Sequence, residues 1–255
     1  MKLKDILSPS FKDFLKPSPP MVVVKTDSDF CREVVQKRFL TQQQMQHAAL
    51  RYQLGKSRSG RTIFWLIDEL GIVRDGRLGD TWVSGMLKAR VPEFLRDWHA
   101  EHCLFGFHLI SETSEAAAVA VIDAMGSAVI LSELFPQMVW LAPASCFTVD
   151  LLAPLQGRQV ILFPRTDATG SNYLFHLSLA DTARRHYGLD ITVNEVLEQY
   201  ATADQKSRAI DLVGYLFEAS DHQAANDPNS AFIQSEISLY PTRNQLLFQL
   251  NPLSV

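Results

Sequence analysis

The sequence has few cysteines, and none of them lies near another. Cysteine occurs at positions 31, 103 and 146, and this number and spacing give neither a disulfide framework nor a set of zinc ligands. Long apolar runs are also missing. No stretch approaches the roughly 18 consecutive apolar residues of a membrane span, and the first residues lack the apolar core of a secretory signal. We therefore expect a cytoplasmic protein that makes no contact with membranes.

Common catalytic motifs are missing as well. A P-loop needs Gly, four residues and then Gly-Lys-Ser/Thr, whereas here Gly55-Lys-Ser comes first and Gly60 comes last. No serine lies in a nucleophile elbow. His99, His102 and His108 match no common spacing of metal ligands, so we expect structural or surface histidines.

The charge is distributed unevenly along an otherwise ordinary composition. Hydrophobic residues make up 47% of the chain and charged residues 20%, as in soluble globular proteins. The first 100 residues hold 17 Lys and Arg against 11 Asp and Glu, and the remainder holds 7 against 17, which gives the net charge of −4. Such asymmetry indicates contact of the basic part with a polyanion. Two ordinary solvated surfaces are the alternative.

Four segments follow from the changes in pattern. Residues 1–27 are proline-rich near their end and predict an extended arm. Residues 28–112 predict two helices and then a β-meander with glycine turns, which together form a smaller, basic α+β domain. Residues 113–220 predict an α/β domain. The last segment, 221–255, begins with a loop-like stretch, and its final 25 residues alternate weakly and predict an edge strand or a docking tail.

Within residues 113–220, short apolar runs alternate with helical patterns. The expected strands are 118–122, 138–142, 159–163 and 190–193. Strands that alternate with helices indicate βαβ units and hence a parallel sheet flanked by helices. The fold class that we expect is therefore α/β, preceded by the smaller α+β domain.

Two of these strands run directly into acidic residues. Asp123 follows the first strand, and Pro164-Arg165-Thr-Asp167 follows the third. Groups at the carboxyl ends of neighbouring parallel strands share a crevice, and two carboxylates there could ligate Mg²⁺ against a phosphate. Arg165 could instead bind a phosphate directly. The structural alternatives are helix N-caps for both aspartates and a surface salt bridge for Arg165.

Basic residues gather around the expected meander, where aromatic residues lie between them. They suit non-specific contact with a sugar-phosphate backbone. The candidates are Lys56, Arg58, Arg61, Arg74 and Arg77.

About two thirds of the chain resembles the toprim-like domain proteins of bacterial mobile elements and prophages, which are distant relatives of the topoisomerase–primase catalytic domain. The segments that carry the resemblance are 62–68 (TIFWLID), 102–109 (HCLFGFHL), 139–142 (VWLA), 157–164 (GRQVILFP), 197–202 (LEQYAT) and 211–216 (DLVGYL). The resemblance implies a toprim-like parallel sheet and, in active members, Mg²⁺ held by a glutamate and a pair of aspartates.

The acidic motifs of that family are altered here. Residues 123–128 read DAMGSA where relatives read ESEKTA, and residues 164–167 read PRTD where relatives read PDxD or PDxN. Arg165 puts a cation where a metal ion would bind. The resemblance therefore implies a toprim fold whose metal site is degenerate.

Three functions are compatible with these features of the sequence. The first is a degenerate, primase-like protein that binds nucleic acid or a nucleotide during mobile-element DNA replication or mobilisation, with little catalysis. Its partners would be single-stranded or primer-template DNA, with other replication or mobilisation proteins. The second is a Mg²⁺-dependent primase-like or nuclease-like enzyme that uses Asp123 and Asp167 as catalytic residues and metal ligands. The third is a protein-interaction module.

Overall fold

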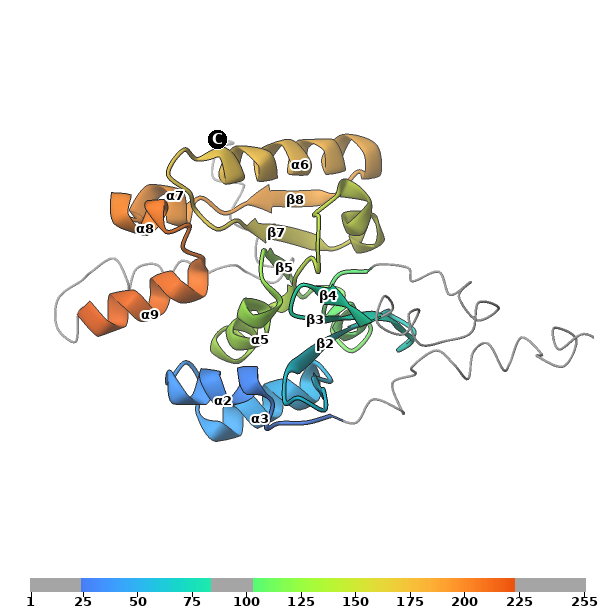
Figure 1. The fold of residues 1–255 in the computed structure, drawn as a ribbon. Helices are drawn as coiled ribbons and strands as arrows, with labels where there is room; N and C mark the ends of the chain where they lie inside the picture. Colours follow the sequence, from blue (N-terminus) through green and yellow to red (C-terminus); the bar gives the residue numbers. More distant parts are fainter. Residues whose placement is uncertain (1–23, 84–102, 223–255) are drawn as a thin grey trace, which may run out of the picture. The chain divides into compact units, whose positions relative to one another are not determined.

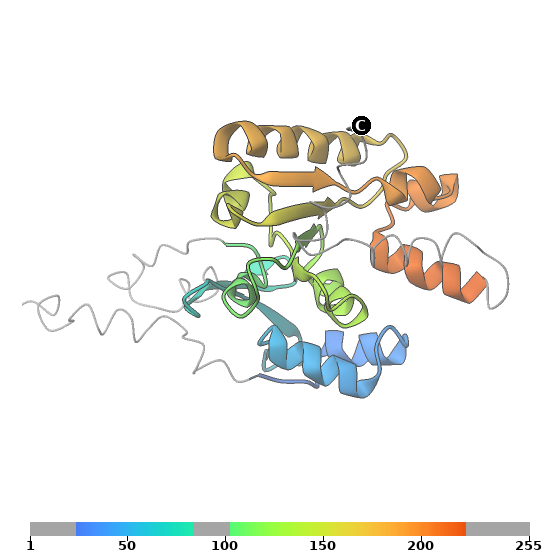
Figure 2. The same ribbon diagram turned by 180° about the vertical axis from the view of Figure 1, so that it is seen from behind.

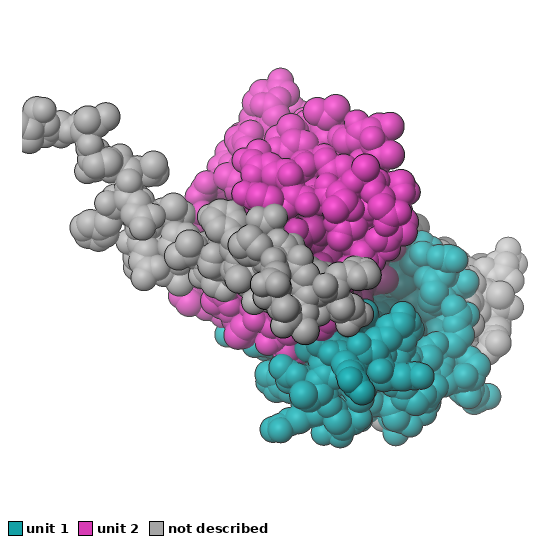
Figure 3. Space-filling view, turned by 90° about the vertical axis from the view of Figure 1, so that its left-hand side faces the viewer, with its two compact units in different colours: residues 1–112 teal, residues 113–255 magenta. Residues whose placement is uncertain are grey.

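The structure is a computed structural model that describes residues 24–83 and 103–222. The chain divides into two compact units, Met1–Glu112 and Thr113–Val255, which Figure 3 shows in different colours. Most of the expected arm and nearly all of the expected tail lie outside the described residues, as do His99 and His102.

The first unit begins with two helices, α2 (Asp29–Gln36) and α3 (Gln42–Arg51). Thr41 starts α3 through a capping box, in which its hydroxyl accepts from the Gln44 backbone N–H and the Gln44 side chain accepts from the Thr41 N–H. This pairing satisfies two of the N–H groups that a helix start leaves without partners.

The expected meander follows these helices in the first unit. Its strands are β1 (Gly55–Lys56), β2 (Thr62–Ile67), β3 (Val73–Leu78) and β4 (Thr81–Trp82), and they pair antiparallel in sequence order. The Asp29 carboxylate accepts from the backbone N–H of Thr62, which ties α2 to β2. Tyr52 stacks on Phe105, with ring centroids 5.1 Å apart. The smaller α+β domain that the sequence predicts is confirmed.

The second unit is built on a four-stranded parallel sheet. Its strands are β5 (Val119–Ile122), β6 (Val139–Leu141), β7 (Gln159–Phe163) and β8 (Asp190–Val193). They lie in the order β6-β5-β7-β8, and Figure 1 labels β5, β7 and β8. Every residue of β5, β6 and β7 is buried, and burial of each large apolar side chain contributes about 1.5–3 kcal/mol. The parallel α/β fold is confirmed.

The connections between these strands place a crevice at the middle of the sheet. Helix α5 (Met125–Leu134) joins β5 to β6, the short 3-10 helix η5 (Val149–Leu155) leads back to β7, and α6 (Ser171–Tyr187) joins β7 to β8. Figures 1 and 2 both show α6 beside β8. Since the chain leaves β5 and β7 in opposite directions, right-handed crossovers put α5 and α6 on opposite faces. The carboxyl ends of β5 and β7 therefore flank a topological switch point.

In the sequence, Thr202 and Gln205 predict a capping box that opens one final helix through residues 210–217, whereas the structure has two helices there. The capping box of Thr202 and Gln205 is present, but it starts only α8 (Ala203–Ser207), which follows α7 (Val196–Tyr200). Ala209 has a φ of 51°, so the helix stops before it, and α9 (Leu212–His222) begins anew. None of the described helices is long and apolar enough to cross a membrane.

Candidate functional site

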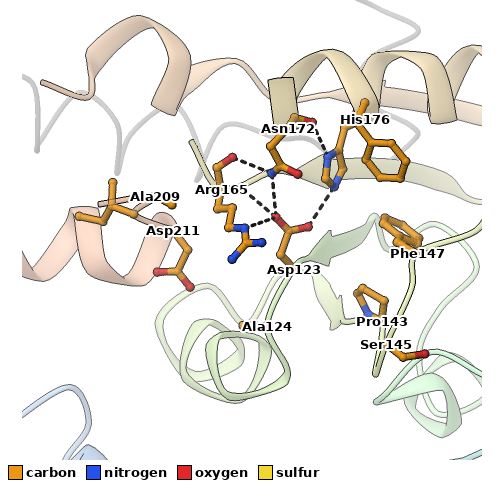
Figure 4. Close-up of a pocket in the computed structure, with 12 residues that line it drawn as sticks. Asp123, Ala124, Pro143, Ser145, Phe147, Arg165, Asn172, His176, Ala209 and Asp211 are labelled. Carbon is orange, nitrogen blue, oxygen red and sulfur yellow. Dashed lines mark hydrogen bonds and ion pairs between the residues drawn. The ribbon is translucent and has the colours of Figure 1, made fainter. Parts of the chain in front are cut away.

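A pocket of about 490 Å³ lies at the switch point of the parallel sheet. Its walls come from the residues that follow β5, β6 and β7, from the first turns of α6 and from the turn before α9, as Figure 4 shows. Asp123 and Arg165 both line it. The structure therefore brings these two candidates together in the crevice.

The carboxylate of Asp123 is surrounded by donors from its own chain. Its Oδ1 lies 3.0 Å from Nε2 of His176. Its Oδ2 accepts from the backbone N–H of Arg165 and from the side-chain amide of Asn172, each at 3.0 Å. Asp123 does not cap α5, because the N-cap of that helix is Ala124 and the helix start has no side-chain capping hydrogen bond. The N-cap alternative for Asp123 is therefore wrong.

These donors set the charge of Asp123. Burial would raise the pKa of its carboxyl, but the hydrogen bond and charge of His176, with the bonds from Arg165 and Asn172, outweigh burial and hold the pKa below its usual value. The Asp123 side chain is only 18% exposed. The group is thus a buried carboxylate that its partners keep ionised.

Both nitrogens of the His176 ring face acceptors. Nδ1 lies 2.8 Å from the backbone oxygen of Asn172, and Nε2 faces Asp123. A carbonyl oxygen only accepts, so Nδ1 carries a hydrogen, and a second proton must lie between Nε2 and the carboxylate. The ring is 2% exposed. With both nitrogens engaged, His176 has no free nitrogen with which to act as a general base.

Arg165 contributes its backbone and its side chain in different ways. Its N–H donates to Asp123, and its carbonyl accepts from Asn172 at 2.8 Å. Its guanidinium Nε is 3.9 Å from Asp123 Oδ2, and the side chain is 58% exposed. The main chain of Arg165 therefore fixes the crevice, while most of its charge remains open to the pocket.

The carboxylate of Asp167 bonds to residues 169–172, at and just before the start of α6. Its carboxylate accepts from the backbone N–H groups of Thr169, Ser171 and Asn172, and from the Thr169 hydroxyl. The Thr169 hydroxyl and these N–H groups hold the pKa of Asp167 well below its ordinary value. Asp167 does not line the pocket. It accepts from N–H groups at the start of α6, but the N-cap of that helix is Gly170, so the N-cap alternative for Asp167 is also wrong.

The donor set around the two acids does not fit Mg²⁺. A magnesium ion needs oxygen ligands with free lone pairs in near-octahedral geometry, whereas N–H and O–H groups occupy the oxygens of Asp123 and Asp167. In residues 24–83 and 103–222, no three His, Cys, Asp or Glu side chains are grouped so that they could hold a metal ion. Metal binding would require these donors to move away.

Sequence reasoning missed Asn172 and His176. They lie four residues apart on α6, and so on the same side of that helix, where they reach Asp123 from the neighbouring strand. The available signal was two polar residues at this spacing on the otherwise apolar side of the helix. Asn172 also joins the two predicted acids, because its backbone N–H donates to Asp167.

The predicted basic residues of the first unit are mostly engaged. Lys56 pairs with Asp27 at 2.5 Å and Arg74 with Asp68 at 2.6 Å. Arg77 lies over the ring of Trp82. Arg58 and Arg61 are exposed, so these two remain the accessible cations of the predicted set.

Residues 29–166 match a protein family described as a domain of unknown function, DUF6371. The matched range is more than half of the sequence. The chain belongs to this family. A comparison with curated proteins found no match for this DUF6371 protein. The family range contains Asp123 and Arg165 and ends just before Asp167.

Solved structures similar to this DUF6371 protein include three primase domains. They are the catalytic core of DnaG (15% identity, TM-score 0.45, 90% of this chain and 88% of that one), the RNA polymerase domain of Mycobacterium tuberculosis DnaG (13%, 0.43, 98% and 95%) and a DnaG catalytic domain bound to ssDNA (15%, 0.42, 94% and 93%). All three TM-scores are below 0.5, so the fold assignment rests on the strand order and register of the DUF6371 protein itself.

Proposed function

We propose that this protein binds nucleic acid or a nucleotide in the crevice beside Asp123, without a divalent cation and with little catalysis. The observation that carries the proposal is the state of Asp123, whose oxygens are taken by His176, Asn172 and Arg165. The pocket is then left with the exposed Arg165 guanidinium as its cation. Such a site suits a phosphate better than a metal ion.

The fold supplies two further features that favour an anion here. The crevice lies at the switch point of a parallel sheet, where ligands of α/β proteins bind. The ten-residue helix α5 begins beside it, and Ala124, its N-cap, lines the pocket without a side chain that caps the helix. The N–H groups of this first turn add a partial positive charge.

The wider role that we propose follows from the toprim-like resemblance. The protein would act in the cytoplasm during replication or mobilisation of mobile-element DNA, on single-stranded or primer-template DNA and with other proteins of that process. The exposed Arg58 and Arg61 of the first unit would add non-specific contacts with the backbone of the strand.

The proposal is tested by the binding of labelled single-stranded DNA to the full chain, measured by fluorescence anisotropy at several salt concentrations without Mg²⁺. We expect Arg165→Gln to weaken binding and to reduce the salt slope by roughly 1, the loss of one phosphate contact. Arg185→Gln is the matched control, because Arg185 is similarly exposed, at 68%, but lies later on α6 and pairs with Asp181. Equal affinity and slope in the Arg165→Gln variant and the wild type would refute the proposal.

The Mg²⁺-dependent enzyme is the second candidate, favoured by the position of Asn172. Its backbone and side chain bond to Asp167 and Asp123, so the two predicted acids share one neighbour. A calorimetric titration of the wild type with Mn²⁺ decides between the candidates. Binding that is lost in Asp123→Ala and Asp167→Ala supports the enzyme, and the absence of binding supports the metal-independent site.

A protein-interaction role is the third candidate. Its specific support is a group of exposed apolar side chains on α6, namely Leu174, Phe175 and Leu177. Absence of DNA binding at low salt, with Arg165 intact, would favour this candidate over the other two.

A further inference from the structure

Two phenylalanine side chains line the pocket beside Asp123. Phe175 is 46% exposed although it is a large apolar residue. It lines the pocket together with Phe147. Each ring meets the buried His176 ring at a steep angle, with centroids 5.3 Å and 5.7 Å away. The half-buried Phe147 ring and the exposed Phe175 ring at the pocket wall are suited to stacking on a planar ligand.

The pocket wall carries charges of both signs. The Asp123 carboxylate lies against the buried His176 ring, which faces its Oδ1. The remaining charges are the Arg165 guanidinium and the Asp211 carboxylate, and both residues line the pocket; Figure 4 shows the Arg165 side chain between Asp123 and Asp211. One cation beside one anion can bind a single phosphate, but it supplies too little positive charge to neutralise a chain of phosphates.

Asp211 is fixed in this position by the ends of two helices. Its Oδ1 accepts from the Gly214 N–H at the start of α9. Its Oδ2 accepts from the Ser127 hydroxyl in the first turn of α5. The carboxylate therefore remains at the pocket as an acceptor for ligand hydroxyl or amino groups, and as a charge that repels additional phosphates.

We propose that the pocket takes one nucleoside monophosphate unit, with its base against Phe147 and Phe175, its phosphate at Arg165, and Asp211 opposing longer phosphate chains. The volume of about 490 Å³ lies within the range of roughly 300–1,000 Å³ typical of small-ligand sites. This inference rests on the proposed function and gives it a substrate class. The nucleoside monophosphate belongs either to a free mononucleotide or to the 5′-phosphorylated end of a strand.

The test is calorimetric binding of AMP, ATP and ribose 5-phosphate to the full chain without divalent ions. Ribose 5-phosphate keeps the sugar and phosphate but lacks the base. It should therefore bind more weakly than AMP by roughly fivefold to a hundredfold, the effect of one stacked base. ATP should bind about tenfold more weakly than AMP, because its additional charges meet Asp211.

Three variants sharpen this test. Phe175→Ala should weaken AMP binding and leave the affinity for ribose 5-phosphate unchanged. Leu174→Ala is its matched control, since Leu174 is adjacent, 62% exposed and not part of the pocket wall. Asp211→Asn keeps an N-cap side chain for α9 and should bring the affinities for ATP and AMP close together.

The outcomes separate this inference from the proposed function. The inference is overturned if ribose 5-phosphate binds as tightly as AMP, or if Phe175→Ala leaves AMP binding unchanged. If either result is found but single-stranded DNA binding still depends on Arg165, the proposed function holds and only the inference about the mononucleotide fails. Competition between AMP and a 5′-phosphorylated oligonucleotide, but not its 5′-hydroxyl form, identifies the strand end as the source. Binding of AMP without that competition identifies the free nucleotide.

Discussion

His176 Nε2 lies 3.0 Å from Oδ1 of Asp123, in the crevice at the carboxyl end of β5. A donor of the chain itself thus sits where a divalent cation would approach this carboxylate. The bond joins α6 to the residue after β5, and it is buried on the histidine side. Its removal should affect both the stability of the second unit and the metal preference of the crevice.

We expect His176→Ala to lower the free energy of unfolding by about 1–3 kcal/mol, because it leaves a buried carboxylate without a main donor. Urea denaturation measures the change. His186→Ala is the control, since His186 is exposed near the end of the same helix, and it should change stability little. Equal losses in the two variants would show that the contact with Asp123 is energetically neutral.

The same variant should increase the affinity for Mn²⁺. Loss of the imidazole frees Oδ1 of Asp123, an oxygen ligand of the kind that hard cations prefer. Electron paramagnetic resonance of free Mn²⁺ reports the bound fraction. Adding Asp123→Asn to His176→Ala should abolish the gain, and a gain that survives this second change would place the ion elsewhere.

Stability should depend on pH through Asp123. Its pKa is lowered in the folded state, so its contribution is complete above the unfolded pKa of about 3.9 and is lost as pH falls through the lower folded value. The difference in unfolding free energy between wild type and Asp123→Asn should therefore be constant above about pH 5 and shrink in more acidic solution. A difference that grows on acidification would contradict this sign.

Asp167 should matter for the start of α6 and little for ligand binding. Asp167→Ala removes the acceptor for the N–H groups of Ser171 and Asn172, so these amides should exchange their hydrogens faster. Hydrogen exchange followed by mass spectrometry over the first turn of α6 tests this. Unchanged exchange there, with weaker DNA binding, would instead assign Asp167 to the ligand.

Alkylation should distinguish the three cysteines in the native protein. Cys146 is exposed, whereas Cys31 is buried. Burial raises the pKa of the Cys103 thiol to about 12, so almost no thiolate is present at pH 8. Brief treatment with iodoacetamide at that pH should modify Cys146 first, as peptide mass spectrometry would reveal. Faster labelling of Cys103 would contradict the raised pKa of its thiol.

The sequence predicted the secondary elements well where a local rule applies. Thr41 and Thr202 each have a glutamine three residues later, and both form capping boxes, because the two partners of such a box are close along the chain. The buried strands also follow directly from their continuous apolar runs. The break at Ala209 was missed, because Ala209 takes the left-handed position of a Schellman turn that glycine usually fills.

For the candidate site, the sequence by itself determined the fold class and the edge of the sheet where Asp123 and Arg165 meet. The alternation of strands and helices dictates a parallel sheet, and the ends of parallel strands converge. Only the tertiary structure decided what surrounds Asp123. Asn172 and His176 are 49 and 53 residues away along the chain, and no local pattern encodes which carboxylate a helix will face when it packs on the sheet. The chemistry of the crevice therefore depends on the packing of α6.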